Sequence, residues 1–507
     1  MNITSALGPR PSALGSRLSA MLILVIAVAP LSAQQRQAAT PARPRTVAID
    51  RTKQPTPAKS PELKVPAWTK MRLSNGAELV VSAKRDLPLV SVSINFLGGA
   101  NQFEDAAKLG VASFTTSMLN EGTTSRSGDQ LADAQQLLGT RITANVGDES
   151  GSIGFTALSD KLEPALDLLA DMMLNPVFPA QGLERLRAQR LVSLTQAKDQ
   201  PGAIANNVFS KVVYGDEHPY GRVVNEQTTR AITREDVVAF HREYFKPGRA
   251  SITVVGDVDP ARVKAAFEKA FANWSAGGEK PAFTYPPAPA SKSTTIYLVD
   301  KPKAAQSVIN IGLPGPSRDT PDYYAISVMN HILGGLFQSR LNHLIREVKG
   351  YSYGVGSGFS YGRGPGAFSA GGDIVSEKTD SALIDFMNEL RGVQGSKPFT
   401  EDEIKQGKES LIQSLPRRFA SVDGVNGAIS GLYVNDLPES YYQEYAAKIE
   451  AVTPDDLQRV AKKYIDLNNL NIVIVGDRAT IEESLRKTGI APIVILDIEG
   501  KRVPATP

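Results

Sequence analysis

The chain has 507 residues, of which 42% are hydrophobic, and it contains no cysteine. This length exceeds what one domain usually needs, so we expect at least two domains with separate cores. The absence of cysteine excludes disulfide bonds, thiolate metal sites and a cysteine nucleophile. Residues 1–65 hold nine Lys/Arg and two Asp/Glu, a net charge of +7, which leaves −4 of the total +3 for residues 66–507. Nothing in this balance indicates a nucleic-acid partner.

Residues 1–33 have the pattern of a secretory signal peptide. Arg10 and Arg17 precede an apolar run at 20–30, which is shorter than the roughly 20 residues needed to cross a bilayer. We therefore predict export to the periplasm with cleavage after Ala33, and an uncleaved membrane anchor is the alternative. Residues 34–65 are rich in proline and predict an extended, disordered tether.

The sequence repeats itself once. Residues 231–257 align with residues 451–477 without a gap, at a constant offset of 220, and both segments end in Val-Gly-Asp. A second match, of residues 159–166 with residues 376–383, follows in the same order. The repeat predicts two homologous halves. Their boundaries are expected at 66–277 and 295–495, with a Pro-rich linker at 278–294 and a tail at 496–507.

Each half is expected to combine strands with helices. Residues 90–96 alternate apolar with polar side chains, which is typical of a half-buried strand. Apolar residues recur at helical spacing over 162–173, until Asn175-Pro176 ends the pattern. The charged cluster at 184–190 is typical of a solvated helical face. We predict an α+β fold of two homologous halves, each a mainly antiparallel sheet with helices packed on one face.

Six short motifs occur in order along the chain: a helix at 109–123, Tyr-Gly-Asp-Glu-His-Pro-Tyr-Gly at 214–221, Ile-Thr-Val-Val-Gly-Asp at 252–257, His-Ile-Leu-Gly-Gly at 331–335, Ser-Arg-Leu at 339–341, and Arg-Glu-Val-Lys-Gly-Tyr-Ser-Tyr at 346–353. Together they resemble the pitrilysin/insulinase family of zinc peptidases, in the two-half form of mitochondrial processing peptidase and its bacterial relatives. The resemblance implies the clamshell fold of those metallopeptidases.

The helix at 109–123 lacks the metal-binding residues that active members of this family carry. Where they have His-x-x-Glu-His, this chain has Ser113, Thr116 and Ser117, and the family's spacing places Ser193 at the third ligand, a glutamate in active members. Neutral hydroxyls are poor ligands of catalytic zinc, and a threonine cannot act as a general base near neutral pH. The resemblance therefore implies that this chain binds no metal.

The four histidines do not replace the missing motif. They show no pair at helical ligand spacing, so we expect them to serve packing or hydrogen bonding. They are His218, His241, His331 and His343.

A second feature of the family is retained. Active members use an arginine and a tyrosine, seven residues apart in the second half, to contact the substrate beside the zinc, and these match Arg346 and Tyr353. A guanidinium can hold a peptide carbonyl, and a phenol can donate to a developing oxyanion. The spacing alone would favour a surface Arg346 paired with Glu347 and a Tyr353 buried in a strand, but the resemblance reverses that preference.

These features lead to one main hypothesis and two alternatives. The chain is the non-zinc-binding subunit of an exported heterodimeric zinc metallopeptidase, inactive alone, whose partner is a homologous His-x-x-Glu-His subunit carrying the zinc and whose substrates are peptides or unfolded polypeptides. The first alternative is a non-catalytic peptide-binding or scaffold protein of the same fold. The last is an autonomous hydrolase with Ser113 or Ser117 as nucleophile, although neither has a nearby histidine or a G-x-S-x-G turn.

Overall fold

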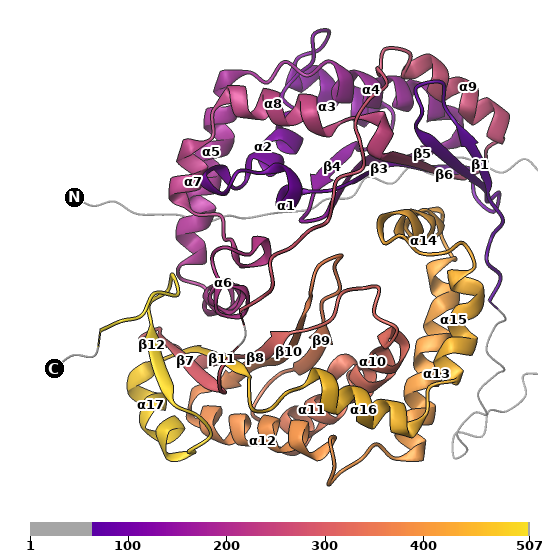
Figure 1. The fold of residues 1–507 in the computed structure, drawn as a ribbon. Coiled ribbons are helices and arrows are strands. Elements are labelled where there is room, and N and C mark those ends of the chain that lie inside the picture. Colours follow the sequence, from indigo (N-terminus) through magenta and orange to yellow (C-terminus); the bar gives the residue numbers. More distant parts are fainter. Residues whose placement is uncertain (1–62, 290, 505–507) are drawn as a thin grey trace, which may run out of the picture. The chain divides into compact units, whose positions relative to one another are not determined.

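Two six-stranded sheets organise the chain, one in each half of the repeat (Figure 1). The computed structural model describes residues 63–289 and 291–504. The predicted signal peptide and residues 34–62 of the predicted tether lie outside the described residues, while Leu63 and Val65 at the end of the tether are partly buried. Within the part of the chain that the structure describes, no helix is long and apolar enough to span a membrane.

The first sheet has the strand order β1-β2-β6-β3-β5-β4. Four of its five pairings are antiparallel, and the exception is the parallel pair of β2 with β6. The strands are β1 (Thr69–Arg72), β2 (Glu78–Ala83), β3 (Leu89–Leu97), β4 (Thr143–Val146), β5 (Ser150–Leu158) and β6 (Ala250–Gly256).

The second sheet has the order β12-β7-β11-β8-β10-β9. Three of its five pairings are antiparallel, and β7 is parallel to both β11 and β12. The strands are β7 (Thr295–Asp300), β8 (Gln306–Pro314), β9 (Val355–Phe359), β10 (Ala367–Val375), β11 (Asn471–Gly476) and β12 (Ile493–Leu496).

The two sheets confirm the predicted α+β fold of two homologous halves. The order β2-β6-β3-β5-β4 in the first sheet recurs as β7-β11-β8-β10-β9 in the second. Only the outermost strand differs, since β1 precedes β2 in the chain whereas β12 is the last strand of its half. Each half also has its own large cluster of buried apolar side chains.

The helices follow the same repeat. In the first half they are α1 (Ala100–Phe103), α2 (Val111–Met118), α3 (Gly128–Leu137), α4 (Leu162–Leu174), α5 (Ala180–Ala197), α6 (Pro201–Tyr214), α7 (Glu226–Ala231), α8 (Arg234–Tyr244) and α9 (Pro260–Ala270). In the second half they are α10 (Tyr323–Asn330), α11 (Arg340–Asn342), α12 (Thr379–Gly392), α13 (Glu401–Arg418), α14 (Val422–Val434), α15 (Tyr441–Glu450), α16 (Pro454–Tyr464) and α17 (Arg478–Lys487), with the π-helical segments η5 (His331–Gly335) and η6 (His343–Val348).

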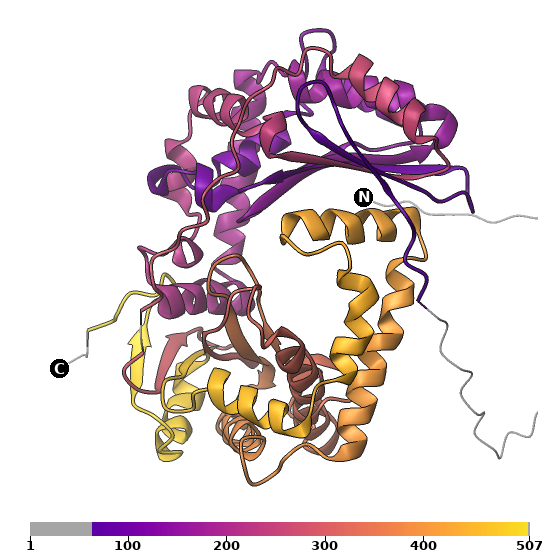
Figure 2. The same ribbon diagram turned by 45° about the vertical axis from the view of Figure 1, so that its right-hand side comes forward.

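The two halves exchange one helix each. Most helices of a half cover one face of its own sheet, as predicted, but α6 packs on β8 and β11 of the second sheet, and α14 packs on β3 and β6 of the first (Figures 1 and 2). Helices α6 and α14 occupy equivalent places in the repeat, at the offset of 220. The second face of each sheet is therefore covered by the other half.

The two exchanged helices bind in chemically different ways. Helix α6 packs through apolar side chains, among them Ile204 and Val208, against valines of the second sheet. Helix α14 binds through hydrogen bonds: Asn426 Nδ2 donates to the backbone oxygens of Ser91, at 3.1 Å, and Thr253, at 3.0 Å. Asn426 Oδ1 also accepts from Ser93 Oγ at 2.7 Å. The α6 junction is thus mainly apolar, whereas the α14 junction adds these hydrogen bonds to an apolar cluster that includes Val80 and Val255 of the first sheet; it is called the polar junction below.

The polar junction corrects the prediction for strand β3. The alternation at 90–96 predicts a half-buried strand, but Ser91 and Asn95 are each only 6% exposed because α14 covers them. Asn95 Nδ2 donates to Ser430 Oγ of α14 at 2.9 Å. The polar face of this strand binds a helix that lies more than 300 residues further along the chain.

An ion-pair network at Asp322 should make the stability of the second half depend on pH. This carboxylate is 9% exposed and accepts from Arg459 Nη1 at 2.7 Å, Lys463 Nζ at 2.9 Å and Tyr464 Oη at 2.7 Å. Burial alone would raise the pKa of Asp322, but these hydrogen bonds lower it to about 2, from an ordinary value of 3.8. Because the folded-state pKa is the lower one, the group stabilises the fold above about pH 4 and loses that effect as the pH falls toward 2.

Asp322→Asn should therefore lower the free energy of unfolding at neutral pH by at most about 2 kcal/mol, since the exposed partners are screened by water. The difference from wild type should shrink between about pH 4 and pH 2, which urea unfolding at several pH values would measure. Asp160→Asn, at an exposed carboxylate, is the matched control. A difference between wild type and Asp322→Asn that stays constant over this pH range would contradict the assignment.

Candidate functional site

Helix α2, which carries the altered metal motif, is held at its N-terminus by a carboxylate. Glu104 accepts the backbone N–H of Gly110 at 3.0 Å and that of Ala112 at 2.7 Å. Gly110 has a φ of 102°, in the left-handed region that favours glycine. Burial raises the pKa of Glu104. This carboxylate thus serves as the cap of α2.

Ser113 is the motif residue that meets the neighbouring helix. Its hydroxyl accepts from Arg190 Nη2 of α5 at 3.0 Å. The two helices that would share a metal in an active relative are therefore adjacent, as the resemblance implies. The groups that meet between them are a hydroxyl and a guanidinium.

The other three motif positions do not join this contact. Thr116 is buried, and its hydroxyl lies within hydrogen-bonding distance of the carbonyls of Ala112 and Ser113, at 3.2 and 3.1 Å. Ser117 and Ser193 are exposed, and Ser193 Oγ donates to a backbone carbonyl of its own helix. The hydroxyls of Thr116 and Ser193 are thus used by the helices that carry them.

This donor set does not fit a zinc ion. A guanidinium beside Ser113 places a positive charge where a divalent cation would have to bind, and the hydroxyls carry no negative charge to offset it. Across residues 63–289 and 291–504, no three His, Asp or Glu side chains come together as a metal site would need. We therefore derive no chemistry from a metal bound by this chain.

The charged cluster at 184–190 is only in part the solvated face that its composition predicts, since Glu184 and Arg185 are exposed but Arg187 and Arg190 are not. The Arg187 side chain is 13% exposed and donates to the backbone oxygens of Thr229 at 2.6 Å and Ile232 at 2.8 Å. Arg190, three residues further on, contacts Ser113. Their spacing could have indicated this burial in the sequence, because Arg187 and Arg190 share a helical face with the apolar residues Leu183 and Leu194.

The histidines lie apart from one another. His241 Nε2 is 2.7 Å from the carbonyl of Met173, and His331 Nε2 is 3.0 Å from Ser410 Oγ. His218 stacks on the ring of Tyr214. Burial lowers the pKa of all three histidines, which favours the neutral imidazole.

Arg346 lies in the π-helical segment η6. Its guanidinium carbon is 4.3 Å from the centroid of the Phe337 ring, a cation–π contact. Arg346 Nη1 is 2.9 Å from Glu347 Oε1, in a geometry that makes no hydrogen bond. The pairing with Glu347 that the spacing alone favours is therefore present, together with an aromatic contact that the spacing does not reveal.

Tyr353 lies in the loop between η6 and the edge strand β9. Its side chain is 91% exposed, so the expectation of a tyrosine buried in a strand, taken from spacing alone, is wrong. The loop is folded back by hydrogen bonds from Gly350 N to Arg346 O at 3.1 Å and from Tyr351 N to Ile345 O at 2.9 Å. The Tyr353 phenol makes no hydrogen bond with another described residue.

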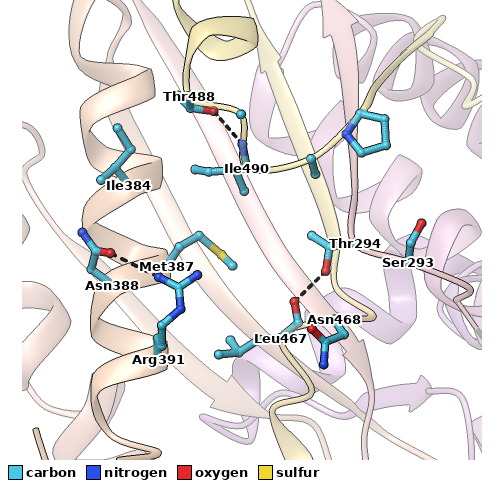
Figure 3. Close-up of a pocket in the computed structure, with 13 residues that line it drawn as sticks. Ser293, Thr294, Ile384, Met387, Asn388, Arg391, Leu467, Asn468, Thr488 and Ile490 are labelled. Atoms are coloured by element: carbon cyan, nitrogen blue, oxygen red, sulfur yellow. Dashed lines mark hydrogen bonds between the residues drawn. The ribbon is translucent and has the colours of Figure 1, made fainter. Parts of the chain in front are cut away.

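A cavity of about 640 Å³ lies elsewhere in the second half, beside α12 and the end of α17 (Figure 3). Thr294 Oγ1 donates to Leu467 O at 2.7 Å in its wall, and Arg391 Nη1 donates to Asn388 Oδ1 at 3.3 Å. The lining has one basic and no acidic side chain, and none of the predicted site residues. It therefore offers no acid–base pair for hydrolysis.

Two family descriptions match the chain. Residues 79–219 match Insulinase (Peptidase family M16), and residues 231–411 match Peptidase M16 inactive domain. Together the two matches span more than half of the sequence. The first lies within the first half of the repeat, and the second begins near the end of that half and continues into the second half.

Relatives cover most of the chain. The uncharacterized zinc protease YmxG of Bacillus subtilis is 24% identical over 76% of this chain and 92% of its own length. An uncharacterized zinc protease of Mycobacterium leprae is 27% identical over 78% of this chain and 88% of its own.

Solved structures have the same fold. A peptidase M16 inactive domain from Pseudomonas fluorescens superposes with a TM-score of 0.74 at 28% identity, covering 81% of this chain and 98% of that one. The periplasmic protease PqqL of Escherichia coli has a TM-score of 0.69 at 16% identity, over 88% of this chain and 49% of its own. The latter likeness concerns the fold alone.

Proposed function

Because the chain belongs to the M16 (insulinase) family of peptidases, we propose that it is the metal-free subunit of a heterodimeric zinc metallopeptidase. In this role it supplies Arg346 and Tyr353 to the substrate beside the zinc of a homologous His-x-x-Glu-His partner. Its substrates are peptides or unfolded segments of polypeptide.

One observation carries the proposal: the Tyr353 phenol of the retained pair is free for a ligand, whereas the hydroxyls of Ser113, Thr116 and Ser193 in the lost motif are engaged by other groups. The Tyr353 side chain is 91% exposed, and the Arg346 side chain is 30% exposed beside Glu347 and the Phe337 ring. Ser113 and Thr116, in contrast, are engaged with Arg190 and with backbone carbonyls. A description as an inactive domain, which residues 231–411 match, agrees with such a division of labour.

Arg346 and Tyr353 would act through electrostatic interactions with the substrate. Arg346 would hold a backbone carbonyl of the bound peptide, and the Tyr353 phenol would donate a hydrogen bond to the oxygen that becomes negative as the peptide bond is attacked. A single donor of this kind commonly contributes about 3 kcal/mol to transition-state stabilisation. Neither group can start hydrolysis by itself, because neither activates a water molecule near neutral pH.

The proposal predicts no peptidase activity for the purified chain and full activity after mixing with its zinc-bearing homologue. A quenched fluorescent peptide library would measure cleavage by each protein alone and by the mixture, and size-exclusion chromatography would measure their association. A chelator should abolish the activity of the mixture. Association without any gain in cleavage would favour the scaffold alternative, and chelator-sensitive cleavage by the isolated chain would contradict the proposal.

The proposal includes export. The leader pattern of residues 1–33 supports secretion to the periplasm, where the partner would also have to be found. Fractionation of cells that express the full chain, with N-terminal sequencing of the mature protein, tests it. A protein that keeps residues 1–33 and stays in the cytoplasm would contradict export and leave the catalytic proposal untouched.

A further inference from the structure

A groove of about 710 Å³ follows one face of α13 in the second half. The α13 residues that line it recur every three or four positions from 403 to 417, a length of about 21 Å along a helix. The opposite wall is the segment 332–340. The α13 side is formed by Glu403, Gln406, Gly407, Glu409, Ser410, Gln413, Ser414 and Arg417.

The wall opposite α13 has an unusual backbone. It includes Ile332 in the π-helical segment η5 and continues to Arg340, shortly before the π-helical segment η6 begins at His343. Such π-helical turns are rare overall but common at functional sites. The wall approaches α13 closely at Gly407, where a Cβ would lie 2.7 Å from Ile332 Cγ1. The groove is therefore built by a specific local backbone and by a glycine that permits the contact.

A buried hydroxyl in the groove lacks a partner. Ser339 is 2% exposed, lines the groove, and its Oγ makes no hydrogen bond with the described residues. Such a group costs about 1–3 kcal/mol when it stays unsatisfied. A ligand with polar atoms in the groove would satisfy it.

The groove adjoins the proposed catalytic pair through one side chain. Phe337 lines the groove and is 65% exposed, and the Arg346 guanidinium lies on its ring. A ligand in the groove that reaches Phe337 is thus next to Arg346.

The charges of the groove balance. Arg340 donates to Glu403 at 2.7 and 2.6 Å. Burial alone would raise the pKa of Glu403, but the hydrogen bonds from Arg340 lower it to about 2, so both partners stay ionised and the pair has no net charge. Glu409 and Arg417 have opposite signs. The remaining polar groups are amides and hydroxyls, which both donate and accept hydrogen bonds as a peptide backbone requires.

We propose that this groove, here called the α13 groove, binds an extended and uncharged segment of the peptide substrate and places a large apolar side chain of that segment on Phe337. At about 3.3 Å per residue its length holds about six residues. The inference deepens the proposed function, on which it rests for the reaction that follows binding, but the binding itself needs only this chain.

The test uses the isolated chain and fluorescence anisotropy, so that no partner or metal is involved. The probe is a labelled peptide of seven neutral residues, Gln, Ser and Ala with one central Phe, and the comparison peptides replace the Phe by Ala or add two Lys or two Glu. Phe337→Ala should weaken binding of the Phe peptide roughly tenfold. Leu137→Ala, which removes an 86% exposed side chain from α3, should leave binding unchanged.

Ser339→Ala separates binding from folding. Loss of an unsatisfied buried hydroxyl should leave the midpoint of urea unfolding unchanged or raise it, while peptide affinity falls a few-fold. Equal affinity of wild type, Phe337→Ala and Ser339→Ala for the Phe peptide would overturn the proposal, as would tighter binding of the charged peptides. If these variants lose peptide but no mixture with a zinc-bearing homologue cleaves it, the α13 groove stands and the proposed function fails. If the mixture cleaves peptide while both variants keep their full peptide affinity, the proposed function stands and the α13 groove fails.

Discussion

In the reconstituted heterodimer, Arg346→Ala or Tyr353→Phe should lower kcat by roughly ten- to a hundredfold, while the free energy of unfolding changes little. The loss of kcat follows because both groups act on charge that develops during the reaction. Stability should be spared because the Tyr353 hydroxyl is exposed and the Arg346 guanidinium contributes one cation–π contact and a partly exposed pairing with Glu347. Exposed pairs of this kind are worth at most about 1 kcal/mol.

The double variant distinguishes a joint role from two separate ones. If Arg346 and Tyr353 act on the same transition state, their combined effect should be smaller than the product of the single effects. Arg391→Ala, at an arginine lining the cavity of Figure 3, is the matched control and should retain full activity. Full activity of the double variant would remove the proposed role of this chain in catalysis.

The repeat was the most predictive part of the sequence. Thr233 and Thr453, aligned at the offset of 220, each cap a helix by accepting a hydrogen bond from an aspartate N–H three residues on. The strands β6 and β11 that follow them occupy the same place in the two sheets. Capping signals of this kind occur in both halves of the sequence, because each half forms the same set of helices and strands from its own residues.

The site was predictable only where chemistry is visible in single residues. The sequence alone shows that Ser113 and Ser117 replace the metal ligands, because their side chains lack the donor nitrogens of histidine. The contacts of Arg190 with Ser113 and of Arg346 with Phe337 could not be predicted from the sequence, since the distance between the residues of each pair depends on packing. The sequence predicts that Arg190 belongs to a solvated charge cluster, but α5 packs against α2 and brings Arg190 to Ser113.

The sequence does not predict the exchange of α6 and α14 between the halves, for a related reason. Periodicity shows that a helix has a face to bury, but not which sheet receives it. Asn206 of α6 and Asn426 of α14 are equivalent residues in the repeat. Asn206 is exposed and accepts one hydrogen bond, from Asn310 at 3.1 Å, whereas Asn426 is buried among backbone and hydroxyl groups of the first sheet.

Asn426→Ala should lower the free energy of unfolding by about 3 kcal/mol. The side chain is 5% exposed, and its removal leaves Ser93 Oγ and two backbone carbonyls without the partner that α14 provides. Each buried polar group that loses its partner costs about 1–3 kcal/mol, although the hydroxyls can rotate toward each other and recover part of this. Urea unfolding followed by circular dichroism measures the loss.

The matched control comes from the repeat itself, because Asn206→Ala removes the equivalent amide at the exposed position and should cost less than about 1 kcal/mol. Hydrogen exchange would locate the effect, since the first protection lost in Asn426→Ala should be that of β3, β6 and α14, while α6 and the second sheet stay protected by their apolar contact. Equal losses of stability in the two variants would show that the polar junction adds nothing to the fold. The apolar contacts and the remaining hydrogen bonds between the halves would then account for their association.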